Sequence, residues 1–179
     1  MIKEIYFDKR LEPYIGNLKI AVGKEKNLKF RKKKSWELNN LSKFIKYGII
    51  KTDYGIYFKY NYKLDKAKHR TITQSEWDDN KISLFEKDFK SKRQFIRISF
   101  LFLNLVLKKF EKSNIKDKVL FSLTFVSEEY DNIFDDDNFI NQVIFRMYGI
   151  RENEEMFDYK NLNNNKNSIG ETICIVARN

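Results

Sequence analysis

The residues of this chain that could do chemistry are few and lie far apart in the sequence. His69 is the single histidine and Cys174 is the single cysteine. A general base or a nucleophile needs a neighbour that takes its proton or orients it, and neither residue has such a neighbour at a recognisable spacing. One histidine is also too few for a His-rich metal site. We therefore interpret His69 as a surface residue and Cys174 as a core residue, and predict no catalytic residue.

The carboxylates do not match a known metal-binding or nucleotide-binding pattern either. A calcium loop needs a glycine at its sixth position and a glutamate at its twelfth, and the aspartate run 135–137 is followed by neither. Asp53 and Lys63 come nearest to the acid-and-lysine arrangement of a metal-dependent nuclease, but Asn61 stands at the expected second carboxylate position. None of the six glycines forms a phosphate-binding loop. The sequence predicts no metal, no cofactor and no enzymatic activity.

Charge is distributed unevenly along the chain. Residues 1–118 carry a net charge of +16 and residues 119–179 a net charge of −6. This asymmetry predicts an anionic partner for the basic portion and allows a cationic partner for the acidic portion. However, 27 of the 35 cationic residues are lysines, in a chain that is also rich in isoleucine and asparagine. An AT-rich coding sequence produces the same pattern, so composition alone can imitate a nucleic-acid-binding surface.

Two segments combine positive charge with aromatic side chains, as surfaces that bind nucleic acids do. The run 29–34 (KFRKKK) precedes Trp36, and the tyrosines at positions 57, 60 and 62 alternate with lysines. For the run 29–34 we favour a solvated strand end, with Trp36 as the first core residue of the following helix. A half-buried strand explains the tyrosines about as well as a stacking platform does. The candidate binding residues are Arg31, Lys32, Lys33, Lys34, Trp36, Lys59, Lys63, Lys90, Arg93 and Arg97 on the basic side, and Asp135, Asp136 and Asp137 on the acidic side.

Two classes of function remain open after these exclusions. The first is a non-catalytic protein-binding module, such as an inhibitor or immunity-type protein of a bacterial or phage conflict system. The second is a nucleic-acid-binding protein that uses its Lys/Arg-rich face. We place the first slightly ahead, because the chain is small, rich in aromatic residues and without recognisable catalytic groups. The N-terminal ten residues lack the apolar stretch of a secretory signal, and the single cysteine suits a reducing compartment, so a cytoplasmic location is expected.

The element expected to organise the fold is a long amphipathic helix over residues 83–112. Apolar side chains recur at helical spacing along it, and Lys90, Arg93 and Arg97 fall on the opposite side. Ile98 and Leu101 place apolar surface on that polar side, which predicts that the middle of the helix is covered on two faces. The apolar run 95–107 is shorter than the roughly 20 residues of a membrane span, and it is interrupted by polar residues.

Shorter elements surround this helix in the predicted fold. Alternating or continuous apolar residues predict strands at 54–64, 119–126 and 169–177, and a β-hairpin within 18–31. Helical spacing predicts further helices at 35–47, ended by Gly48, and at 137–148, ended by Gly149. At 179 residues the chain fits one domain. The fold class expected is therefore α+β, with a mostly antiparallel sheet packed on the long helix and two or three shorter helices.

Overall fold

The computed structural model of the chain describes residues 2–11, 36–60, 62, 71–127, 140–154, 156, 158–164 and 170–179. Five strands form one antiparallel sheet in the order β1-β7-β5-β6-β4. The strands are β1 (Ile2–Phe7), β4 (Ile82–Phe85), β5 (Val119–Ser127), β6 (Ile140–Gly149) and β7 (Glu171–Arg178). A separate hairpin pairs β2 (Ile49–Thr52) with β3 (Gly55–Phe58). The α+β class predicted from the sequence is confirmed.

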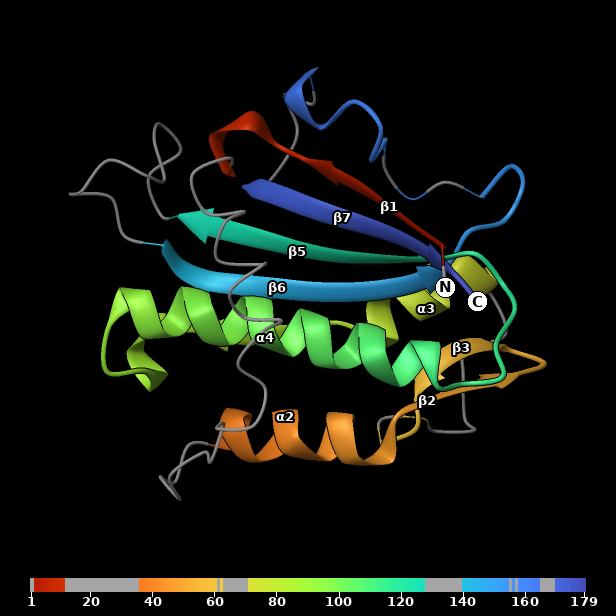
Figure 1. Cartoon of the computed structure of the whole chain (residues 1–179), viewed down its shortest axis with the longest axis horizontal. Helices are drawn as coiled ribbons and strands as arrows, with labels where there is room; N and C mark the ends of the chain where they lie inside the picture. Colours follow the sequence, from red (N-terminus) through yellow and green to blue (C-terminus); the bar gives the residue numbers. More distant parts are fainter. Residues whose placement is uncertain are drawn as a thin grey trace.

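Within the described residues, three α-helices accompany the strands: α2 (Trp36–Tyr47), α3 (Ile72–Asp79) and α4 (Lys92–Glu111). Short 3-10 turns occupy Lys9–Leu11, Glu86–Asp88 and Leu162–Asn164. Figure 1 shows α4 lying along one face of the sheet, and α2 lying on the side of α4 that faces away from the sheet. The β2–β3 hairpin continues from the C-terminal end of α2.

The main core fills the space between the sheet, α4, α2 and the hairpin. Strand alternation points Phe121, Phe145 and Ile175 toward α4, where they are buried. On the opposite side of α4, Figure 1 shows α2, and residues of α2 and α4 are in contact. The expected covering of α4 on two faces is therefore confirmed.

The long helix is shorter than predicted, because residues 83–91 are not α-helical. Ile82 and Leu84 are buried and alternate with Ser83 and Phe85 in β4, which pairs with β6. The side chain of Ser91 accepts a hydrogen bond from the backbone N–H of Gln94 at 3.2 Å and caps the new helix start. Pairing with β6 therefore overrides the helical spacing of the apolar residues in 83–91.

The helix predicted at 137–148 is wrong, because this segment forms β6 from Ile140 onward. β6 lies between β5 and β4, and it is buried on both of its faces. Val143 and Met147 face α4, whereas Ile144 and Tyr148 lie on the other face of the sheet. A strand that is apolar on both faces loses the alternation by which a strand is recognised. Gly149 ends the element, as predicted.

Other predicted boundaries were more accurate. α2 ends at Tyr47, and Gly48 adopts a φ of +74° while its N–H donates to the carbonyl of Phe44 at 3.0 Å. β5 and β7 match their predicted strands to within two residues. The strand predicted at 54–64 ends at Phe58, because the partner strand β2 begins only at Ile49. The hairpin predicted within 18–31 lies outside the described residues.

Candidate binding surface

The most strongly connected group of polar residues is a buried cluster around Glu76 on α3. The side chain of Glu76 is 0% exposed and forms a two-pronged ion pair with Arg151, with Nη2 to Oε1 at 2.6 Å and Nη1 to Oε2 at 2.8 Å. Its carboxylate also accepts the backbone N–H of Ile56 at 2.5 Å and that of Gly149 at 2.7 Å. Glu76 therefore joins α3 to the ends of β3 and β6.

Asn80 extends this connection by one helical turn. Its Nδ2 donates to the carbonyls of Ile56 and Met147 at 2.7 and 3.0 Å, and its Oδ1 accepts the N–H of Phe58 at 3.0 Å. These contacts satisfy backbone groups that strand pairing would otherwise satisfy. The two side chains thus attach the hairpin to the large sheet.

The chemistry of this cluster is structural. All four hydrogen bonds of the Glu76 carboxylate come from the protein itself, so the carboxylate is already occupied. Its hydrogen bonds to Arg151 raise the pKa of that guanidinium, against the opposing effect of burial. Arg151 also donates from Nη1 to the Thr73 hydroxyl at 2.9 Å, and this hydroxyl donates to Glu154. Sequence reasoning missed the cluster, because its members are scattered along the chain.

Tyr57 next to this cluster provides a test of the burial that the structure shows. Burial, assisted by the negative charges of Glu76 and Asp79, raises the pKa of Tyr57 to about 12 from 10.0. In the unfolded chain the phenol loses its proton first, so stability is full below about pH 10 and falls toward pH 12. We expect the thermal midpoint of the wild type to fall more steeply over this interval than that of Tyr57→Phe. Parallel pH profiles of the two melting curves would contradict this prediction.

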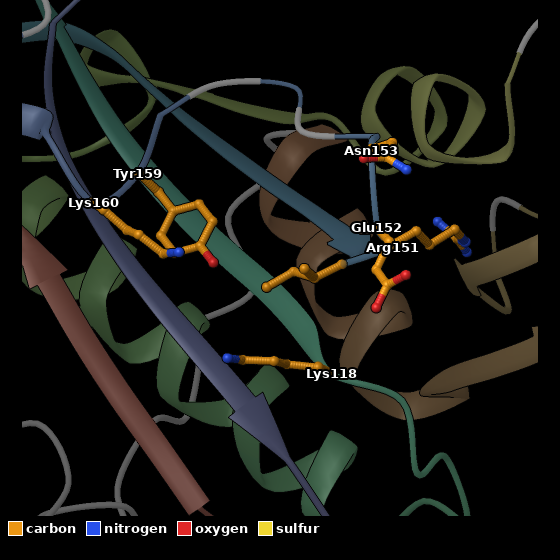
Figure 2. A pocket seen from close by; sticks show the side chains of 7 residues that line it. Lys118, Arg151, Glu152, Asn153, Tyr159 and Lys160 are labelled. Carbon is orange, nitrogen blue, oxygen red and sulfur yellow. The ribbon is translucent and has the colours of Figure 1, made fainter.

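A shallow depression lies on the face of the sheet away from α4. Seven residues line it: Lys118, Ile150, Arg151, Glu152, Asn153, Tyr159 and Lys160. Figure 2 shows that Arg151 and Asn153 point away from Lys118 and Tyr159. Arg151 is held by Glu76, and Lys118 lies 3.7 Å from a Glu4 carboxylate oxygen. The cations around the depression therefore do not converge on one point.

Cys174 lies in the sheet beneath a second, smaller apolar cluster. It is buried with Leu120, Tyr148 and Val176 on the face away from α4. Burial raises the pKa of its thiol, which keeps the sulfur protonated and unreactive. The interpretation of Cys174 as a core residue is confirmed.

Two exposed tyrosines, Tyr47 and Tyr60, lie together where α2 ends and β3 ends. Tyr47 is 50% exposed and Tyr60 is 37% exposed, and their rings stack with centroids 5.8 Å apart and an angle of 20°. Lys43, Lys46 and Lys59 are exposed beside them. We call these five residues the tyrosine–lysine surface.

Local geometry explains why residues so distant in sequence meet here. Gly48 ends α2 and turns the chain into β2, and the carbonyl of Gly48 accepts the N–H of Lys59 at 3.0 Å. The N–H of Tyr62 then donates to the carbonyl of Phe58 at 3.1 Å, which closes a turn around Tyr60. The last turn of α2 and the end of β3 are thereby fixed side by side.

The side chains of the tyrosine–lysine surface are held in place by their neighbours. The Tyr60 ring meets the buried Phe44 ring edge to face, with centroids 5.3 Å apart at 88°. Lys43 Nζ donates to the Tyr60 hydroxyl at 3.2 Å, and Lys46 Nζ lies 5.8 Å from the Tyr47 ring centroid. No carboxylate of the described residues forms an ion pair with Lys43, Lys46 or Lys59. The surface therefore combines positive charge with aromatic rings of fixed orientation.

The sequence predicted only part of this surface. Lys59 belongs to it, whereas Tyr57 of the predicted tyrosine ladder is buried and contacts Tyr62, with ring centroids 5.3 Å apart. Tyr47 was missed, because a tyrosine in the last turn of an amphipathic helix gives no signal of its own. The three tyrosines of the ladder therefore do not form one stacking surface, and Tyr60 instead stacks on Tyr47 of α2.

The other candidate binding residues are not brought to this surface by the described structure. Lys90 is exposed just before α4, and Arg93 and Arg97 are exposed in its first turns. Figure 1 shows this end of α4 far from the β2–β3 hairpin. Trp36 is the first residue of α2. The remaining candidates, together with His69, lie outside the described residues: Arg31, Lys32, Lys33, Lys34, Lys63, Asp135, Asp136 and Asp137.

Within the described ranges, no three His, Cys, Asp or Glu side chains are close enough to hold a metal ion. None of the described helices, α4 included, combines the length and the apolarity that crossing a membrane requires.

Comparison of the chain with protein families, with curated proteins and with solved structures found no match. Function must therefore be argued from the residues of the chain itself.

Proposed function

We propose that this protein is a non-catalytic binding module that contacts its partner through the tyrosine–lysine surface. The observation that carries the proposal is the stacked, exposed pair Tyr47 and Tyr60, surrounded by three lysines without a carboxylate partner among the described residues. Tyrosine is enriched where proteins bind other molecules, because it offers a large rigid ring and a polar tip.

The charge of this surface indicates the class of partner. Lys43, Lys46 and Lys59 leave three positive charges around the rings, and a lysine near the end of a helix is also favoured by the helix dipole. A negatively charged partner gains the most binding free energy on this surface, because its charges pair with the lysines. A positively charged partner would bring like charges together while water is removed from them. We therefore infer an anionic partner.

Two other groups that could have suggested catalysis are already engaged in the fold. The Glu76 carboxylate is saturated by Arg151 and two backbone N–H groups, and the Cys174 thiol is buried and protonated. This supports binding rather than chemistry as the role of the described part. No described contact bears on the narrower predictions of an inhibitor or immunity-type protein and of a cytoplasmic location, and both stay predictions.

The proposal is tested by capture from a lysate of the native host with matched variants. We expect a specific partner, protein or nucleic acid, to be retained by the wild type and by Tyr54→Ala. The double variant with Tyr47→Ala and Lys46→Ala should lose it. Tyr54 is the matched control, because it is an exposed tyrosine in the β2–β3 turn, outside the tyrosine–lysine surface. A partner retained equally by the double variant would overturn the proposal.

A further inference from the structure

We infer that the tyrosine–lysine surface binds single-stranded nucleic acid, with a base stacked on Tyr47 and phosphates on the neighbouring lysines. This inference rests on the proposed function and names its partner. It differs from the sequence-based alternative, which relied on a broad Lys/Arg-rich face that includes the run 31–34, Lys59, Lys63, Lys90, Arg93 and Arg97.

The ring of Tyr47 is suited to stacking on a base. A base stacks on an aromatic ring only if the ring is exposed and held in a fixed plane. Tyr47 is half exposed, and its orientation is fixed by the nearly parallel Tyr60 ring. Tyr60 is in turn held edge-on against Phe44, which is buried in the main core. The pair can therefore receive a base without first ordering its side chains.

The lysines next to the two rings are suited to phosphate contact. Lys43 and Lys46 lie one helical turn apart on α2, and Lys59 approaches from the end of β3. Lys46 already lies over the Tyr47 ring, and its flexible stem lets the ammonium group move from the ring to the phosphate of a stacked nucleotide. Lys43 and Lys46 thus lie against the two rings, and Lys59 adds an exposed charge next to Tyr60 in the chain.

The choice between partner classes follows from the residue types. Lysine is depleted in protein–protein interfaces, whereas lysine next to aromatic rings is typical of surfaces that track a single strand. In a duplex the bases are stacked on one another, and their faces are not accessible to an exposed tyrosine. Single-stranded nucleic acid therefore suits this surface better than a protein or a duplex.

The test is a titration of a fluorescein-labelled oligo(dT) of about 15 nucleotides, followed by fluorescence anisotropy. Tyr47→Ala should weaken binding about 5-fold to 150-fold, whereas Tyr47→Phe keeps the ring and should stay within about 2-fold. Tyr54→Ala should bind like the wild type. Equal affinities for Tyr47→Ala and Tyr47→Phe would overturn the inference.

Salt dependence tests the lysines independently. Lys43→Gln and Lys46→Gln should each flatten the plot of log affinity against log salt by about 0.7, the contribution of one phosphate on a single strand. Lys160→Gln is the control, because Lys160 follows Tyr159 of the smaller apolar cluster, whereas the tyrosine–lysine surface packs on Phe44 of the main core. Equal slopes for all three variants would contradict the inference. Failure to bind oligo(dT), combined with Tyr47-dependent binding of a protein, would reject the inference and leave the proposed function standing.

Discussion

Glu76→Ala is expected to destabilise the folded protein by about 3 to 5 kcal/mol, the usual cost of removing one partner of a buried ion pair. Glu76 is fully buried, so the variant leaves Arg151 without its carboxylate partner. It also leaves the backbone N–H groups of Ile56 and Gly149 without an acceptor. Urea unfolding followed by circular dichroism measures the loss.

The matched control is Gln74→Ala on the same helix. Gln74 is exposed on α3, and its replacement should change the free energy of unfolding by less than about 0.5 kcal/mol. If Glu76→Ala were as stable as Gln74→Ala, the attachment of the hairpin to the sheet through α3 would be wrong.

Leu103→Ala is expected to cost about 2 to 5 kcal/mol, because it opens a cavity at the centre of the main core. Leu103 is 0% exposed and lies midway along α4, between the sheet and the layer formed by α2 and the hairpin. The thermal midpoint of the variant, measured by calorimetry, should fall accordingly.

Leu105→Ala provides the comparison for this core position. Leu105 occupies the same helix and loses the same atoms, but its side chain is only partly buried. The loss of stability should therefore be clearly smaller than for Leu103→Ala. Equal losses at the two positions would show that α4 does not present the Leu103 side to the core.

Sequence reasoning succeeded where one local signal determined the element. Gly48 ends α2 because its positive φ suits a helix C-terminus, and the continuous apolar run of β5 could be buried only as an inner strand or a core helix. α4 was recognised from its apolar spacing, and only its start was misplaced.

Sequence reasoning failed where tertiary pairing determined the element. β6 carries buried apolar residues on both faces, because strands flank it and an apolar cluster covers each face of the sheet. The same spacing of apolar residues also fits a helix. Residues 83–85 form part of strand β4 because they pair with β6. No local signal distinguishes these cases from helices.

The tyrosine–lysine surface was only partly predictable for a related reason. Lys59 and Tyr60 were noticed for their composition, but the partner ring of Tyr60 belongs to another element. That contact depends on Gly48 and on the register in which Ile49 pairs with Phe58. Charge and aromatic content indicate a type of surface, whereas its location requires the fold.

The most direct test of the tyrosine–lysine surface is lysine acetylation of the free and the oligo(dT)-bound protein, read out by mass spectrometry. Bound oligonucleotide should protect Lys43, Lys46 and Lys59 and leave Lys160 as reactive as in the free protein. Protection of Lys160 with unchanged reactivity at Lys43, Lys46 and Lys59 would contradict the assignment of this surface.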